Sequence, residues 1–117
     1  MYSNSLNDVN SVWQTIISEL YRLPQDIHTI EKNGNIGIWF YAKVSGDVIS
    51  VERAKQNTPS SKIKSTCTIG KEEFSTVYPY YDKWRNGSVA REFIRDNITR
   101  KSSYIFALIH KFDDDKN

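Results

Sequence analysis

Two groups of side chains are of types that carry out chemistry, and their spacing decides what each group could do. Asp47, Glu52 and Lys55 are the types that hold a metal ion and activate water, but Glu52 and Lys55 lie three apart and point to opposite faces of an extended chain. His28 and His110 are far apart in the sequence, with no carboxylate at metal-ligand spacing. We therefore expect no catalytic residues and no bound metal.

Cys67 is the only cysteine, so the chain has neither an internal disulfide nor a paired-cysteine metal motif. Thr66 and Thr68 flank it, and no base partner is evident for a nucleophile. The glycines Gly34, Gly37 and Gly46 fit hairpins better than a phosphate-binding loop, so we expect no cofactor. A reducing, cytoplasmic setting fits a lone cysteine.

The composition is that of a globular protein with one core. The chain has 117 residues, of which 38% are hydrophobic and 26% charged. Its longest apolar clusters, IGIWFYA and YIFALI, fall far short of the about 20 residues that span a membrane, and no export signal is evident at the start. We expect a single domain over residues 1–117 and no membrane partner.

Positive charge is concentrated in the carboxy-terminal half. Residues 62–112 hold ten basic and five acidic side chains, whereas residues 1–61 hold five basic and six acidic ones. This asymmetry points to an anionic partner such as nucleic acid, although solvated helix faces also carry such an excess. The candidate nucleic-acid contacts are Lys62, Lys64, Arg91, Arg95, Arg100, Lys101, Ser102 and Ser103.

Periodicity predicts a helix followed by a sheet in residues 1–54. Apolar residues recur every three or four positions over residues 6–23, and Pro24 ends this pattern. From residue 27 the period changes to two, with turns predicted at Asn33-Gly34 and at Ser45-Gly46-Asp47. The segment is therefore expected to form an amino-terminal helix packed on a three-stranded antiparallel meander.

The central strand of this meander has two different faces. Ile36, Ile38, Phe40, Ala42 and Val44 alternate with Gly37, Trp39, Tyr41 and Lys43. The aliphatic face is expected to pack on the first helix. The face with Trp39 and Tyr41 must be covered by later helices or left as a binding surface.

Residues 55–70 are expected to form a loop with a short extended run at TCTI, and residues 71–112 to be helical. Pro79 predicts either a kinked helix over 71–85 or two short helices meeting there. Ser88 is expected to cap a further helix whose inward-facing residues come from Val89, Phe93 and Ile94. A last helix is expected over residues 101–112, before a frayed tail at 113–117. The fold class is α+β, ending in three or four helices that are expected to close the side of the sheet opposite the first helix.

The phrases KWRNGSVA and NITRKSSYI outline two helices joined by a turn at Asn97-Ile98-Thr99. Residues 71–112 thus resemble the trihelical helix-turn-helix units of resolvase-like and homeodomain-like DNA-binding proteins. That resemblance implies that the last helix enters the major groove, with Arg100, Lys101, Ser102 and Ser103 at its reading end.

The alternative is that the last helix closes the core. Tyr104, Ile105, Leu108, Ile109 and Phe112 form one stripe, and Phe106 with Ala107 extends the apolar surface round the other side. A helix that is apolar nearly all round is normally buried. If Phe106 is not buried in its own chain, it is expected to pack against a partner chain.

We expect a small non-enzymatic binding protein of bacterial or phage type, with nucleic acid as the first partner to test. The rival hypothesis is a protein-interaction module or homodimer whose partner surface includes Trp39, Tyr41, Tyr80 and Phe106. A third class, a ligand-binding protein or enzyme with a pocket at the face of Trp39 and Tyr41, requires a pocket with convergent polar groups.

Overall fold

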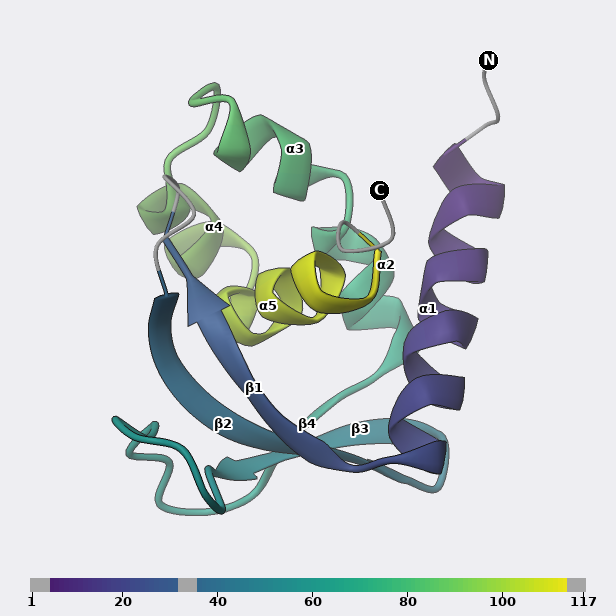
Figure 1. Ribbon diagram of the computed structural model, residues 1–117. Helices are drawn as coiled ribbons and strands as arrows, with labels where there is room; N and C mark the ends of the chain where they lie inside the picture. Colours follow the sequence, from purple (N-terminus) through teal and green to yellow (C-terminus); the bar gives the residue numbers. More distant parts are fainter. Residues whose placement is uncertain (1–4, 32–35, 114–117) are drawn as a thin grey trace.

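The structure is a computed structural model that describes residues 5–31 and 36–113. It consists of an amino-terminal helix, an antiparallel sheet and a series of carboxy-terminal helices, so the predicted α+β class is confirmed (Figure 1). The predicted Asn33-Gly34 turn lies outside the described residues, as does the tail beyond Asp113. Among the described residues, no helix is both long enough and apolar enough to cross a membrane.

The sheet has four strands in the order β1-β2-β3-β4, and all neighbours are antiparallel. The strands are β1 (Gln25–Ile30), β2 (Ile36–Ser45), β3 (Val48–Arg53) and β4 (Cys67–Ile69). The first three are the predicted meander, and the short extended run predicted at TCTI adds the fourth strand beside β3. The turn between β2 and β3 contains Gly46 with φ of 65°, a conformation that glycine adopts without steric cost.

Helix α1 (Ser5–Arg22) covers one face of this sheet with the predicted stripe. Val9, Val12, Trp13, Ile16 and Leu20 are all buried. Opposite them, Phe40 and Ala42 of β2 are fully buried, as expected for the aliphatic face of that strand. Ile36 and Ile38, at the start of the same strand, are exposed, so the helical layer does not cover that end of β2.

The carboxy-terminal helices are α2 (Lys71–Val77), α3 (Tyr80–Arg85), α4 (Arg91–Asn97) and α5 (Ser102–Phe112). Of the two alternatives at Pro79, the structure has two short helices, with Pro79 immediately before α3. The predicted cap at Ser88 is wrong, because α4 begins at Arg91 after Ala90, and the Ser88 amide instead donates to Asn86 Oδ1 in the preceding turn. Of the residues expected to face inward, Ile94 is buried, whereas Phe93 is exposed.

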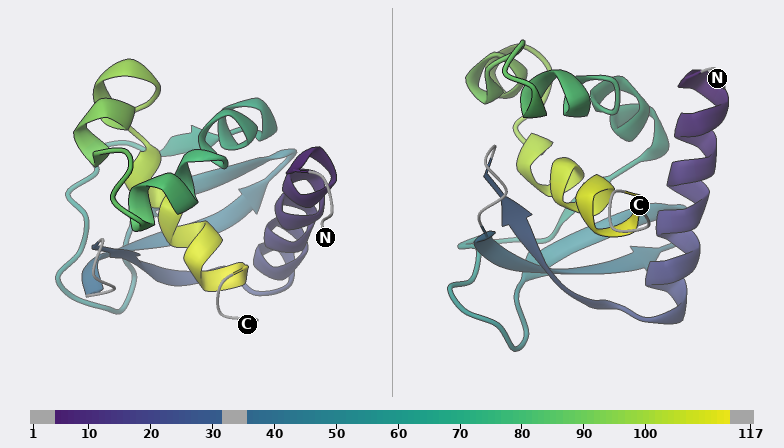
Figure 2. Two further views of the ribbon diagram at one scale, coloured as in Figure 1. Left: turned by 90° about the horizontal axis from the view of Figure 1, so that it is seen from above. Right: turned by 45° about the horizontal axis from the view of Figure 1, so that its top comes forward.

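All of the helices lie on the same side of the sheet (Figure 1 and Figure 2). The expectation that the carboxy-terminal helices close the face opposite α1 is therefore wrong. α5 packs on β1 and beside α1, and its Tyr104 ring lies 4.9 Å from the ring of Phe40. On the other side of α5, Phe106 stacks on Trp84 of α3 at 4.8 Å between ring centroids.

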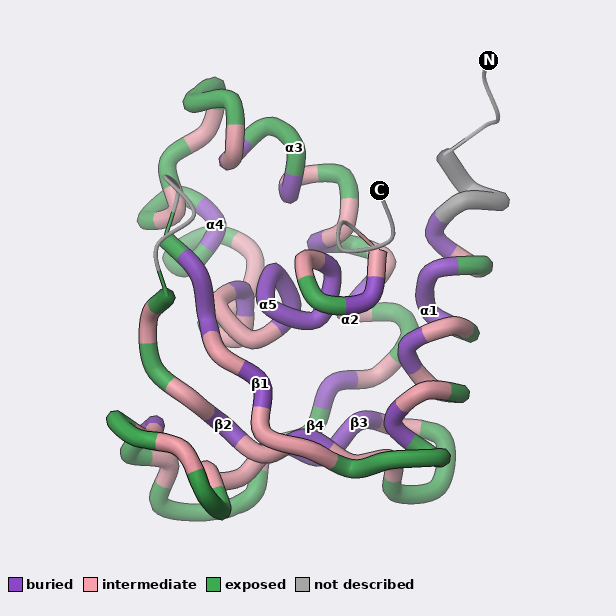
Figure 3. Tube along the Cα trace, viewed as in Figure 1, coloured by how far each residue is buried: buried purple, intermediate pink, exposed green. Residues whose placement is uncertain are grey.

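This central position of α5 explains its apolar surface. One side of the helix needs apolar side chains toward the sheet, and the other side needs them toward α3, so its apolar residues are not confined to one stripe. Every residue from Ile105 to Ile109 is buried (Figure 3). Because one helical layer uses the inner face of the sheet, the outer face is left without a helix.

Candidate binding groove

The outer face of the sheet presents two aromatic rings side by side along β2. Trp39 and Tyr41 both point to this face, and both are partly exposed. The register of β1 places His28 opposite Trp39 and Asp26 opposite Tyr41. The His28 and Trp39 rings meet edge to face, with 5.0 Å between their centroids. Of the two alternatives for this aromatic face, coverage by later helices or an open surface, the structure has the second, because the helices lie on the other side of the sheet (Figure 1 and Figure 2).

The loop between β3 and β4 is anchored to this face by the carboxylate of Asp26. Asp26 Oδ1 accepts the backbone N–H of Lys55 at 2.8 Å. Oδ2 accepts the N–H of Gln56 at 2.8 Å, the N–H of Asn57 at 2.9 Å and the Asn57 side-chain amide at 3.2 Å. Burial raises the pKa of Asp26, but these hydrogen bonds outweigh it and hold the pKa below its ordinary value.

A second anchor joins the same loop to the backbone of β2. Trp39 N–H donates to Pro59 O at 2.8 Å, and Ser61 N–H donates to Trp39 O at 2.7 Å. The side chain of Ser61 is within 3.0 Å of the Tyr104 hydroxyl on α5. The loop thus connects the outer face of the sheet to the first turn of α5.

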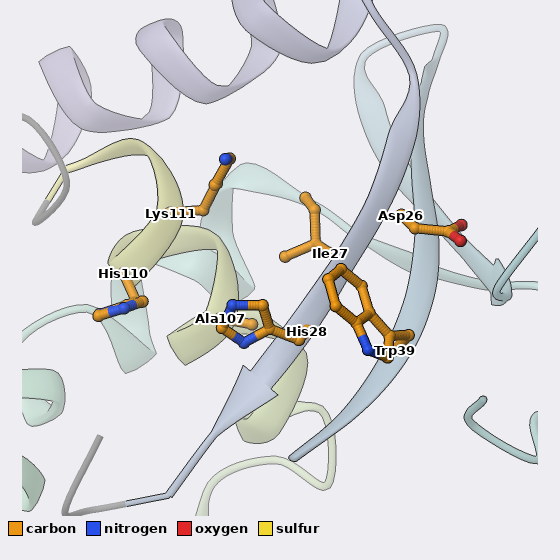
Figure 4. Close-up of a pocket in the computed structure, with 7 residues that line it drawn as sticks. All are labelled: Asp26, Ile27, His28, Trp39, Ala107, His110 and Lys111. Atoms are coloured by element: carbon orange, nitrogen blue, oxygen red, sulfur yellow. The ribbon is translucent and has the colours of Figure 1, made fainter. Parts of the chain in front are cut away.

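Three hollows adjoin one another around this face. The first, of about 250 Å³, lies at the edge of β1 and is lined by residues that include Asp26, His28, Trp39 and Lys111 (Figure 4). The second, of about 580 Å³, shares Asp26 with the first and adds Tyr41 and Lys55. The third, of about 300 Å³, shares Lys55 with the second. We call the three together the outer groove.

Cations line the third hollow and the wall it shares with the second. Arg53, Lys55 and Lys64 line this part of the outer groove, together with the carboxylate of Glu52. Lys55 Nζ lies 5.0 Å from the centroid of the Tyr41 ring and 3.4 Å from Glu52 Oε1. The ammonium over the Tyr41 ring makes a cation–π contact, and the two groups are of the types that bind nucleic acid, the ring through bases and the cation through phosphates.

The structure brings four of the predicted basic contacts to one end of the molecule. Lys62 and Lys64 lie in the loop next to Ser61, and Arg100 and Lys101 lie in the turn just before α5. The bond between Ser61 and Tyr104 fixes these two segments together. We call this group the basic end.

Lys101 is the most constrained member of the basic end. Its Nζ donates to Thr68 O at 2.5 Å and to Glu73 Oε1 at 3.2 Å. Beside this pair, burial raises the pKa of the Cys67 thiol, with Lys101 lowering it and Glu73 raising it. Lys101 thus ties the start of α5 to β4 and has less freedom to reach a partner than Arg100, which is exposed.

The remaining predicted contacts lie elsewhere or are buried. Arg95 is paired with Asp96 on α4, at 2.9 Å from Nε to Oδ1. Arg91 is half-buried, and its guanidinium carbon lies 5.2 Å from the centroid of the Trp84 ring. Ser102 is buried and Ser103 is half-buried.

The expectations that depended on an exposed last helix fail. A helix that enters a major groove must be exposed along its side, and α5 is enclosed between the sheet and α3. Phe106 is fully buried in its own chain, so it is not part of a partner surface. Tyr80 lies on α3, on the helical side of the molecule and away from Trp39 and Tyr41 (Figure 1).

The sequence treated His28 and His110 separately, but the structure brings their rings to 6.4 Å between centroids. His28 lies on β1 and His110 on α5, and both line the first hollow. Nothing in the spacing indicates this proximity, because it results from the packing of α5 on β1. The described residues contain no group of three or more metal-ligating side chains that could hold an ion.

No protein-family model, curated protein or solved structure matches the chain.

Proposed function

We propose that this chain is a non-enzymatic binding protein that holds single-stranded nucleic acid in the outer groove. The observation that carries the proposal is the pair of partly exposed rings, Trp39 and Tyr41, with the Lys55 ammonium over the Tyr41 ring. Proteins that bind single strands combine rings on which bases stack with cations that follow the phosphates. An open antiparallel sheet with aromatic residues is one common way to display such rings.

The position of the cations supports a path for the strand. From the rings, the groove continues to the hollow lined by Arg53, Lys55 and Lys64. Beyond Lys64 lies the basic end, where Lys62 and Arg100 are exposed. Bases would stack at one end of this path and phosphates would lie along the other. A cytoplasmic location belongs to the same proposal, because the single Cys67 is a free thiol.

The test is a fluorescence-anisotropy titration of labelled single-stranded and double-stranded DNA at two salt concentrations. We expect single strands to bind more tightly, because stacked bases in a duplex cannot reach the rings. Each lost phosphate contact should reduce the salt slope by about 0.7 for a single strand. Absence of single-strand binding at low salt would refute the proposal.

Variants then locate the binding surface. Tyr41→Ala should weaken binding by about tenfold, which lies within the about 1–3 kcal/mol measured for one stacked base. Lys64→Glu should weaken it and flatten its salt dependence. The matched control is Lys83→Glu, an exposed charge reversal on α3 that lies away from the groove. Equal effects of the control and groove variants would show only a response to net charge.

The basic end is tested separately with the double variant Lys62→Glu and Arg100→Glu, which changes two exposed residues and leaves the structural contacts of Lys101 in place. If the strand extends beyond Lys64, this variant should weaken the binding of long oligonucleotides more than that of short ones. Unchanged affinity for both would remove the basic end from the path while leaving the groove itself in place.

The second candidate is a protein partner or a second copy of the chain on the same face. The partly exposed rings of Trp39 and Tyr41 favour it, because aromatic side chains are also enriched in the contact surfaces between proteins. Sedimentation velocity would show a dimer directly. In that case Trp39→Ala should release the partner without unfolding the chain, and a complex that survives the substitution would exclude Trp39 from the contact.

A further inference from the structure

The first hollow of the outer groove differs from the other two because a helix closes one side of it. β1 contributes Ile27 and His28, and α5 contributes Ala107, His110 and Lys111. Ile27 and Ala107 are buried and form an apolar wall. The volume of about 250 Å³ is just below the about 300–1,000 Å³ of sites for drug-sized ligands, so a ligand of that class would fill the hollow and extend from its mouth.

His28 and Trp39 line the aromatic side of this hollow. His28 Nδ1 lies 3.1 Å from the carbonyl oxygen of Thr29. Because a carbonyl oxygen can only accept, this contact is a hydrogen bond in the tautomer that carries the proton on Nδ1, and Nε2 is the acceptor of that tautomer. This side therefore offers a ring for a flat ligand to contact and an acceptor for an amino group on that ligand.

The positive charge on the other side of the hollow comes from Lys111 of α5. Lys111 is exposed and forms no ion pair with any described residue. Figure 4 shows Lys111 and Asp26 on opposite sides of β1, so the ammonium and the carboxylate do not face each other. The Asp26 oxygens are also occupied by the loop amides. An anionic group would therefore lie beside α5, and a ring would lie beside Trp39.

We propose that this hollow binds a single nucleoside monophosphate unit, with its base against Trp39 and its phosphate beside Lys111. The unit is either a free mononucleotide or the phosphorylated end of a strand. The second case rests on the proposed function, whereas the first does not require it.

Tryptophan fluorescence measures this binding selectively. Trp13 and Trp84 are buried, with 4% and 3% of their surfaces exposed, so a quencher in the hollow acts mainly on Trp39. Adenosine 5′-monophosphate should quench saturably, and adenosine without the phosphate should bind about tenfold more weakly. Lys111→Ala should weaken the mononucleotide by about threefold to tenfold, as expected for one exposed charge contact. Lys83→Ala, the control on α3, should leave its affinity unchanged.

A second pair of titrations separates the two sources of the ligand. If the strand end is the ligand, oligonucleotides with a terminal phosphate should bind more tightly than those without one, and Lys111→Ala should abolish the difference. If the phosphate makes no difference to oligonucleotides while the mononucleotide binds, the site takes free mononucleotides.

The proposal is overturned if adenosine 5′-monophosphate gives no saturable quenching up to about 10 mM, a concentration at which even weak specific sites fill. Equal affinity of the wild type and Lys111→Ala would also overturn it. Mononucleotide binding without strand binding would refute the proposed function alone, and strand binding without mononucleotide binding would refute this site alone.

Discussion

Replacement of Asp26 tests whether one carboxylate holds the loop that builds the outer groove. The side chain accepts three backbone N–H groups and one side-chain amide from residues 55–57. Two substitutions remove different numbers of these hydrogen bonds. Asp26→Ala removes all four, whereas Asp26→Asn retains one oxygen, which can take the place of Oδ2 and keep three of them.

The magnitude follows from this count. Capping carboxylates that accept backbone amides at helix ends contribute about 0.5–2 kcal/mol, and Asp26 performs the same task for a loop. We expect Asp26→Ala to lower the free energy of unfolding by about 2 kcal/mol and Asp26→Asn by about 1 kcal/mol. For a chain of this size, 1 kcal/mol corresponds to a fall in Tm of about 4 °C.

The effect should depend on pH in a definite direction. The pKa of Asp26 in the folded state is below its ordinary value of 3.8, so the charged form is stabilised by folding. This stabilisation is complete above the unfolded-state pKa and is lost as the pH falls through the lower, folded-state value. The difference in the free energy of unfolding between the wild type and Asp26→Asn should therefore be largest at neutral pH and decrease below about pH 4.

The assay is urea denaturation followed by circular dichroism, at neutral pH and at about pH 3. Asp47→Asn, an exposed carboxylate in the turn between β2 and β3, is the matched control and should change stability by less than about 0.5 kcal/mol. The reasoning would be refuted if Asp26→Ala were as stable as the wild type, or if the gap for Asp26→Asn were the same at both pH values.

Two further predictions concern the core. Gly37→Ala should lower the free energy of unfolding by about 2 kcal/mol or more, because the added Cβ would lie 2.2 Å from Thr29 Oγ1. That oxygen accepts the N–H of Ile38, so the clash would also disturb this hydrogen bond. A Tm within about 2 °C of the wild type would contradict the prediction. Phe106→Asp should unfold the chain rather than release a partner, because it places a charge beside Trp84 in the core. The control Phe106→Leu remains apolar and should stay folded. A cooperative thermal transition for Phe106→Asp would contradict the prediction, because it would show that the position tolerates a charged side chain.

Local sequence determined the elements of this fold. The three-four spacing after residue 6 requires a helix with one apolar face, and the alternation from residue 27 requires strands with two different faces. Pro79 lacks a backbone donor, so the helical run had to be kinked or interrupted there, and the structure has two helices. The burial of α5 was also present in the sequence, because Phe106 and Ala107 extend its apolar surface beyond a single stripe.

Other local signals were misleading because neighbours in the tertiary structure outweighed them. Ser88 has the side chain of a helix cap, but the turn after Asn86 takes its amide and α4 begins three residues later. Phe93 has the hydrophobicity of a core residue, but Ile94 occupies the inward position on α4. A hydrophobic pattern over seven residues does not specify which side of so short a helix is covered.

The candidate site was decided almost entirely by tertiary structure. The sequence determined that Trp39 and Tyr41 share one face of a strand, because alternation in a strand is a local property. It did not determine which face the helices would cover, since that depends on how one helical layer fills the space above the sheet. The contact of Asp26 with residues 55–57, and the approach of His28 to His110, join segments that are distant in sequence. Such pairings have no local signal, because they exist only once α5 has packed on β1 and the loop has folded back against β2.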